Sequence, residues 1–450
     1  MTKPHNDSDK ESGRSTALTT SSSTALSVKN KRGLTSLTKS IVESAIEART
    51  SNQLIDNNWM QKIWDWADKF GLSQIPRQEK ELLELETLEI NFCRPDALKQ
   101  LKDKLILVEK DVEKELSGLR SARILGHPPS YDHLLSLKWD ISSLERLYKT
   151  TNNINYIPVE LNNLEKLREI RLNGVESKKI LIELNKLHNI TKLVIENFDA
   201  ANLIENIFDL TQLIELEMRE PYPIDFSCEY ALDINIPLTL NIIPDSITKL
   251  TNLKTFKIIE SLITELPQSI SSLSNLESLN IIHSKISYIP EDIYKLSNLK
   301  SLVIRGGLVN SLPNSIGKLT ELTSIEVSDN QLSELPESIG HLNKLESLSL
   351  RGNNLNHLPT SIVQLSSLRD LSLQYNQLKT LPNKINTLSR LTMLDLSNNE
   401  LETLPEELGL IPNLERLYIS DNRLNELPTS LTGNYDIFIS NFRQKPKRTS

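Results

Sequence analysis

The sequence has few aromatic residues, two cysteines and no long apolar run, and each shortage excludes a class of protein. Aromatic residues make up 5% of the 450 residues while apolar residues reach 38%, so the core must consist mainly of Leu and Ile. Cys93 and Cys228 are too few for the disulfide framework of a small secreted domain, and we expect two reduced thiols. No stretch approaches the roughly 18 apolar residues of a membrane span, so we expect none.

The chain also lacks an excess of basic residues. The chain has 51 basic and 59 acidic residues, which gives a net charge of −8 at pH 7. Proteins that bind nucleic acid usually carry a basic excess, so we expect no nucleic-acid partner. The N-terminus is hydrophilic and lacks the apolar stretch of a conventional secretory signal, so the prediction is a cytoplasmic protein.

What the sequence does contain is a strict internal period. An apolar residue followed by proline recurs every 23 residues, at Pro244, Pro267, Pro290, Pro313, Pro336, Pro359, Pro382, Pro405 and Pro428. Counted from each proline, apolar residues stand at offsets 3, 6, 9, 12, 14, 19 and 22. A period of this length is the signature of an array in which each unit stacks on the next.

Two spacings within each unit predict its conformation. Apolar residues at every third position, offsets 3, 6 and 9, indicate a helical or 3₁₀ segment that lies against a core. Offsets 12 and 14 alternate as one face of a short strand does. Each unit is therefore predicted to be a strand, a turn and a helical return, with parallel strands on one side of the array.

Offset 17 carries asparagine in the later units. These residues are Asn330, Asn353, Asn376, Asn399 and Asn422. We expect each amide to bond backbone groups that the turn leaves unpaired, so that the amides form a ladder along the array. Ser261, Ser284 and Gly307 stand at this offset in earlier units, where the ladder should be weaker.

Looser copies precede the strict ones. Units near Pro158, Leu181 and Ile204 keep the apolar positions, and residues 135–157 are expected to form another unit. A first, detached copy is predicted to begin at Ile75–Pro76, with Cys93 at offset 17 as a small buried residue.

The repeat LPxxIxxLxxLxxLxLxxNxLxx resembles the 23-residue leucine-rich repeat of the Ras-group and bacterial type, over residues 135–440. That family occurs in intracellular signalling scaffolds and in many bacterial proteins. The resemblance implies an α/β fold: a curved leucine-rich-repeat solenoid with parallel strands on its concave face and a helical N-terminal cap. The segment WDWADKFGLSQIPR resembles the start of bacterial leucine-rich-repeat proteins, and a bacterial effector is one form the chain could take.

Residues 1–74 differ in composition from the repeats. Residues 1–35 are rich in Ser and Thr and are predicted to be a disordered tail, or alternatively an export signal that is not cleaved. Residues 36–74 are predicted to be a helical cap, in which Trp59, Trp66 and Phe70 share one helix face. The alternative is an aromatic helix that binds a partner.

Three further segments interrupt or follow the period. Residues 75–134 should hold the first degenerate repeat and an inserted helix at 96–117, which is either an insertion into the array or a linker between the cap and the main solenoid. The interval from Ile204 to Pro244 is 40 residues instead of 23, so a loop is expected near 221–240, either functional or simply tolerated. Residues 441–450 are expected to form a basic tail. This tail is either a frayed chain end or a segment that attracts acidic partners.

No motif for chemistry is present in the sequence. Gly317–Lys318 lacks the rest of a phosphate-binding loop, the seven histidines are scattered, and no serine lies in a nucleophile elbow. We expect no catalytic residue, no cofactor and no metal.

The candidate site is therefore the concave face, where offsets 11, 13 and 15 should point to solvent. Arg and Tyr are enriched at the centres of protein interfaces. The candidate partner-binding residues are Arg305, Glu326, Arg351, Asp370, Gln374, Tyr375, Asp395, Arg416 and Tyr418. The alternative for each of them is an ordinary solvated strand residue.

The predicted function is a non-enzymatic scaffold that binds a partner protein of unknown identity on its concave face. The alternative is a substrate-recruiting subunit whose catalytic chain, such as a ubiquitin ligase or a phosphatase, is separate. A cytoplasmic location is predicted, with export into the cytosol of a host cell as the alternative. Sequence gives no oligomeric state.

Overall fold

The computed structural model describes residues 58–91, 102, 106, 110, 154, 156–175, 177–198, 200–219, 240–432 and 437–440. The chain divides into two compact units, Met1–Gln61 and Lys62–Ser450. The second unit contains the repeats and is described by itself.

The repeats form one parallel sheet. In the described residues it has 13 strands, and their order in the sheet is their order in the chain. The strands are β1 (Thr87–Asn91), β2 (Glu169–Asn173), β3 (Lys192–Glu196), β4 (Glu215–Arg219), β5 (Thr255–Ile259), β6 (Ser278–Ile282), β7 (Ser301–Arg305), β8 (Ser324–Glu326), β9 (Ser347–Ser349), β10 (Asp370–Ser372), β11 (Met393–Asp395), β12 (Arg416–Tyr418) and β13 (Phe438–Ile439).

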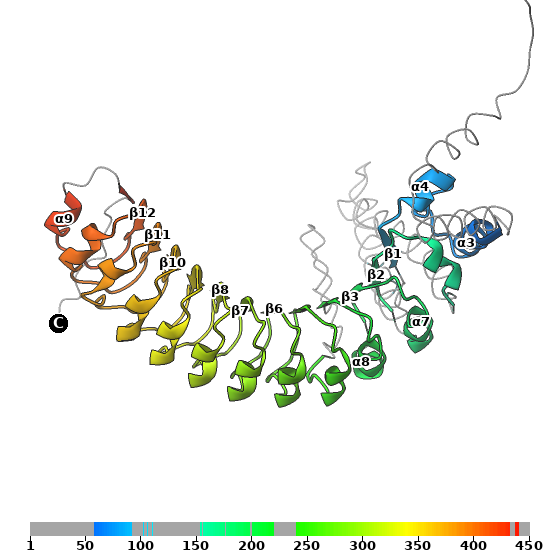
Figure 1. Ribbon diagram of the computed structural model, residues 1–450, viewed down its shortest axis with the longest axis horizontal. Coiled ribbons are helices and arrows are strands. Elements are labelled where there is room, and N and C mark those ends of the chain that lie inside the picture. The colour runs from blue at the N-terminus through cyan, green and yellow to red at the C-terminus, as the bar shows by residue number, and fades with distance from the viewer. Residues whose placement is uncertain are drawn as a thin grey trace, which may run out of the picture. The chain divides into compact units, whose positions relative to one another are not determined.

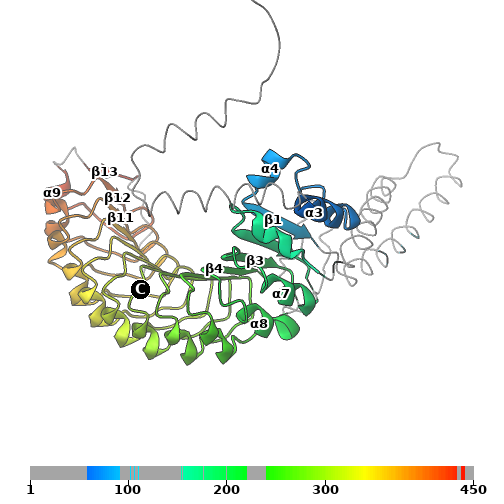
Figure 2. The same ribbon diagram turned by 45° about the vertical axis from the view of Figure 1, so that its right-hand side comes forward.

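Helical segments return the chain from one strand to the next, and most are 3₁₀ turns. Figures 1 and 2 show the strands along the inner side of the curved repeat array and the helical segments along its outer side. The segments are α3 (Asn58–Lys69), α4 (Glu79–Leu83), η1 (Val159–Asn163), α7 (Lys178–Leu184), α8 (Ala200–Phe208), η2 (Asp245–Lys249), η3 (Gln268–Ser272), η4 (Glu291–Lys295), η5 (Asn314–Lys318), η6 (Glu337–His341), η7 (Thr360–Gln364), η8 (Ile385–Thr387), η9 (Glu406–Leu410) and α9 (Thr429–Thr432).

The core lies between these two layers, as the apolar offsets predict. In the unit that begins at Pro336, Ile339, Leu342, Leu345 and Leu348 are all 0% exposed. The proline fixes an extended backbone immediately before the 3₁₀ turn, with φ −69° at Pro336. One thin layer of Leu and Ile thus runs the length of the array, which explains the low aromatic content.

The asparagine ladder predicted at offset 17 is confirmed. The side-chain oxygen of Asn376 accepts a hydrogen bond from the backbone N–H of Leu355 at 3.0 Å. Its side-chain nitrogen donates to the carbonyl oxygens of Leu350 and Leu373 at 2.9 and 3.0 Å. The same pattern links each asparagine at this offset to the preceding unit, and these bonds satisfy backbone groups that face no water.

The ladder is weaker in the earlier units, also as predicted. The hydroxyl of Ser261 is buried and has no hydrogen-bond partner among the described residues. A second set of amides, which the period did not reveal, occupies offset 8 in these units. Asn252, Asn275 and Asn298 each donate to a carbonyl oxygen of the preceding unit, at 3.0, 2.8 and 2.8 Å.

Glutamates at offset 1 connect successive helical turns on the outer side. Both oxygens of Glu406 accept hydrogen bonds from the first backbone N–H groups of α9, at 3.1 Å from Thr429 and 3.0 Å from Ser430. These bonds hold the pKa of the Glu406 carboxyl below its ordinary value. Glu291 and Glu337 bond the next unit in the same way, so a carboxylate replaces the missing partner of N–H groups at a helix start.

The prediction that the first copy is detached is wrong. β1 pairs directly with β2, with Thr87 opposite Glu169, although 82 residues separate the two. The physical reason is that Leu88 and Ile90 need a neighbouring unit to cover them, and β2 offers matching apolar positions. Most of residues 135–157, where another unit was expected, lies outside the described ranges. In the same way β4 pairs directly with β5, although the interval from Ile204 to Pro244 is 40 residues instead of 23.

In the described part of the predicted cap, residues 58–69 form the helix α3, which precedes the first repeat. Ile63, Trp66 and Phe70 are buried, and the indole N–H of Trp66 donates to the carbonyl oxygen of Tyr156 at 3.0 Å. Gly71 ends the helix with φ 65°, the left-handed conformation that favours glycine.

Several predictions fall on residues outside the described ranges. They are the tail at 1–35, the cap before residue 58, most of the helix at 96–117, nearly all of the 221–240 loop, the 441–450 tail and both cysteines. Lys102 and Lys110, which are described, are helical.

Candidate binding face

The inner face of the sheet carries the predicted site residues. In β7, Leu302 and Ile304 are buried while Ser301, Val303 and Arg305 are not. Strands β1 to β12 alternate in the same sense, except that Val194 at offset 13 of β3 is buried. In the remaining strands offsets 11 and 13 point away from the core as expected. Ser328 at offset 15 departs from this pattern. It is 3% exposed and shares a hydrogen bond with the hydroxyl of Ser349 at 3.0 Å.

Two of the candidate residues bind each other. The guanidinium of Arg305 contacts the Glu326 carboxylate, with 2.8 Å from Nε and 2.6 Å from Nη2 to the same oxygen. The residues come from adjacent units, at offsets 15 and 13. The charges of this pair are therefore compensated before any partner arrives.

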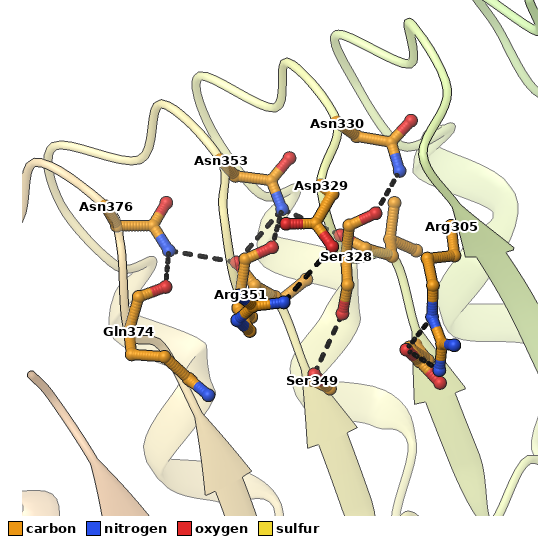
Figure 3. A network of polar contacts seen from close by, with 12 residues as sticks. Arg305, Ser328, Asp329, Asn330, Ser349, Arg351, Asn353, Gln374 and Asn376 are labelled. Atoms are coloured by element: carbon orange, nitrogen blue, oxygen red, sulfur yellow. Dashed lines mark hydrogen bonds and ion pairs between the residues drawn. The ribbon is translucent and has the colours of Figure 1, made fainter. Parts of the chain in front are cut away.

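Arg351 and Tyr375 form a second group together with Asp329, a residue that the sequence reasoning missed. The guanidinium carbon of Arg351 lies 5.2 Å from the centroid of the Tyr375 ring. Its Nη1 donates to the Asp329 carboxylate at 3.3 Å (Figure 3). The available signal was an acidic residue at offset 16 one unit before an arginine at offset 15.

Gln374 stands beside this group at the end of β10 (Figure 3). Its side-chain oxygen is buried and accepts no hydrogen bond from the described residues. An acceptor without a donor costs free energy unless a water or a ligand supplies one.

The remaining candidates lie farther along the array. Asp370 and Arg416 flank Met393 on three neighbouring strands. Among the described residues neither has an ion-pair partner. Asp395 accepts a hydrogen bond from the backbone N–H of Ser397 at 3.0 Å.

Tyr418 packs against a residue that sequence reasoning did not select. Its ring meets that of Phe438 edge to face, with centroids 6.0 Å apart. Phe438 lies on β13, the last strand, and is an exposed aromatic residue. Its offset is one short of the regular period, which is why the pattern did not place it on this face.

The N-terminal part of the same face has a different character, because it is densely charged and internally paired. On three adjacent strands Lys192 lies 3.3 Å from both Glu169 and Glu215. Although partial burial lowers the pKa of Lys192, the two carboxylates raise it above its usual value. Neighbouring Arg219 and Glu217 are 2.9 Å apart and continue the network.

The described residues offer no sign of metal chemistry or of a membrane span. No cluster of three or more His, Cys, Asp or Glu side chains that could hold a metal ion occurs in this part of the chain. None of the helices described is both long and apolar enough to cross a bilayer.

Comparisons with known proteins agree with this architecture. The family model described as a leucine-rich repeat region matches residues 231–331, and the leucine rich repeat model matches residues 320–378 and 366–424. No curated protein sequence matches the chain.

Two bacterial structures are similar to it. A leucine-rich-repeat protein of Leptospira interrogans is 26% identical, with a TM-score of 0.53 and coverage of 64% of this chain and 69% of that one. An internalin of Listeria monocytogenes is 20% identical, with a TM-score of 0.47 and coverage of 64% and 78%. These matches identify residues 231–424 as a leucine-rich-repeat region, and the strict repeat and parallel sheet give the array the fold of a leucine-rich-repeat solenoid, similar to that of the Leptospira protein.

Proposed function

We propose that this chain is a non-enzymatic scaffold that binds a partner protein on the concave face, through the part that runs from β7 to β12. The observation that carries the proposal is the contrast between the two parts of that face. Charged side chains on β2 to β5 are bonded to one another, whereas Asp370 and Arg416 have no ion-pair partner in the described chain and Tyr375 is 53% exposed. Unpaired charge and exposed aromatic area are what a protein partner can use.

The face also has room for a partner. Ser324, Ser347, Ser349 and Ser372 line its centre with small side chains on three successive strands. In the described residues no helix covers these strands, because the helical segments lie on the outer side (Figures 1 and 2).

A capture experiment tests this function. The full chain and an Arg305→Ala, Arg351→Ala, Tyr418→Ala variant are used to capture proteins from cell lysate, which are identified by mass spectrometry. We expect a specific protein to be lost with the variant. The matched control removes three exposed side chains from the outer side, in His341→Ala, Gln364→Ala and Leu410→Ala, and should retain it. Equal capture by all three chains would refute the proposal.

The same experiment addresses the alternative of a substrate-recruiting subunit. In that case one captured protein is a catalytic chain, and the complex has an activity that neither component has alone. Capture of proteins without any such activity supports the simple scaffold.

We propose further that the scaffold is a bacterial effector exported without a cleaved signal. The support is the Ser/Thr-rich composition of residues 1–35 and the likeness to a Leptospira protein. Fusion of residues 1–35 to a reporter tests it, since export of the reporter by a bacterial secretion system is expected, and retention would leave a cytoplasmic scaffold.

A further inference from the structure

One exposed aromatic residue has an unfavourable backbone conformation. The residue at offset 16 has a positive φ in every described unit, and most units place Gly, Asn or Asp there, such as Gly352 with φ 65° and Asn398 with φ 57°. Tyr375 has φ 58° at this position. A bulky residue in the left-handed region is a genuine outlier, because its Cβ crowds the following carbonyl. Burial does not compensate this strain, since the side chain is 53% exposed.

The neighbours of Tyr375 hold it in a defined place. The Arg351 guanidinium stacks over its ring, and Asp329 in turn bonds Arg351. Gly352 makes this arrangement possible, because a Cβ at that position would lie 2.4 Å from the Asp329 carboxylate oxygen. The three side chains come from three successive units, and Figure 3 shows Arg351 and Asp329 side by side at the strand ends.

The hydrogen-bonding capacity of this group is largely unused. A guanidinium has five N–H donors, and the described residues provide Arg351 with one acceptor, Asp329 at 3.3 Å. Exposed ion pairs of this kind contribute little to stability, so another carboxylate can replace Asp329 at low cost. Next to it, the buried oxygen of Gln374 lacks a donor.

We infer that Arg351 and Tyr375 together form an anchor for an extended segment of the partner that carries an acidic side chain next to an apolar one. The inference rests on the proposed function and specifies its partner. The acidic side chain binds the free donors of Arg351 in a bidentate manner, and the apolar side chain covers Tyr375. The stacked guanidinium keeps the ring in position before binding, which lowers the entropy cost of association. Backbone strain such as that of Tyr375 is typical of ligand-binding sites.

Peptide selection tests this specificity on the full chain. A displayed library of random dodecapeptides is selected on the wild-type protein, and the peptides obtained are titrated by fluorescence anisotropy. We expect Asp or Glu at one fixed position beside an apolar residue. Replacement of that acid by Asn or Gln should weaken binding by about tenfold, the value of a charge-assisted pair.

Two variants separate binding from folding. Tyr375→Asn places at this offset the residue that Asn398 already provides and relieves the backbone strain. We therefore expect a thermal midpoint equal to or above that of the wild type and about tenfold weaker binding, as for a lost interface aromatic. Arg351→Lys keeps the charge but not the planar fork, so the preference for an acid should fall while the fold persists. If Tyr375 served the fold alone, Tyr375→Asn would lower the midpoint and leave the affinity unchanged.

The outcomes distinguish this anchor from the general function. Selected peptides without a fixed acid, or an affinity that Tyr375→Asn does not alter, would overturn the anchor. If the Arg305, Arg351 and Tyr418 alanine variant still lost those peptides, binding on the concave face would stand. Peptides that bind this alanine variant as well as wild type would overturn both.

Discussion

Asn376→Ala is expected to lower the free energy of unfolding by about 2–4 kcal/mol, and the ladder geometry sets this magnitude. The mutation leaves the N–H of Leu355 without its only acceptor, in a site where Asn376 is 7% exposed. A buried donor without a partner costs about 1–3 kcal/mol. The two carbonyl oxygens suffer less, because Asn353 still bonds Leu350 and Asn399 still bonds Leu373, each through its side-chain nitrogen.

Urea unfolding monitored by circular dichroism measures the loss, and amide hydrogen exchange locates it. The Leu355 amide should exchange faster in the variant, since its opening no longer breaks a hydrogen bond. Asn413→Ala is the matched control: Asn413 makes one exposed bond, to the carbonyl oxygen of Ser389 at 2.6 Å, and its loss should cost less than about 1 kcal/mol. Equal unfolding midpoints for the two variants, or an unchanged Leu355 exchange rate, would refute the reasoning.

Three further changes probe other contacts between units. The lowered pKa of Glu406 means that its carboxylate contributes stability above the ordinary value of 4.5 and loses that contribution as the pH falls, so Glu406→Gln should flatten the acid side of a plot of urea midpoint against pH. Gly317→Ala should cost about 1–3 kcal/mol in thermal or urea unfolding, because its Cβ would lie 2.2 Å from the carbonyl oxygen of Ser338. Ser284→Asn should stabilise the array by about 1 kcal/mol in the same assay, since the side-chain oxygen of the new asparagine can accept a hydrogen bond from the N–H of Ile263. An unchanged unfolding midpoint would show that the earlier units have no space for the ladder.

The 23-residue period predicts most of the fold because the same residue types recur at the same offsets and favour the same local conformation in successive units. Proline at offset 0, apolar residues at every third position and then alternation fix a 3₁₀ turn and a strand in each unit of the strict repeat. Successive units then stack with each strand beside the next, in the order of the chain. The asparagine ladder followed from the same logic, because a turn that recurs leaves the same backbone groups unpaired.

What the period could not show are contacts at offsets where the residue type varies. The offset-8 amides and the offset-1 glutamates bond the neighbouring unit from positions that many units fill with other residues. The first unit was misplaced because residues 92–153 separate its strand from the rest, and distance in sequence says nothing about adjacency in a stack. β1 joins β2 because exposed apolar residues must be covered, whatever the length of the connection.

The contacts among the candidate binding residues could not be predicted from the period either. The offsets predict which residues lie on the concave face, but only the structure shows which of these residues are already bonded to one another. Arg305 and Arg351 look alike in sequence, yet Arg305 makes two close contacts with one carboxylate while Arg351 makes one longer contact and stacks on a ring. A charge that is already bonded must break its bond before it can bind a partner, so it adds little affinity. For this reason the binding energy should come from the end of the array where, among the described residues, charged side chains have few partners and a tyrosine is exposed. The more densely charged end should contribute much less.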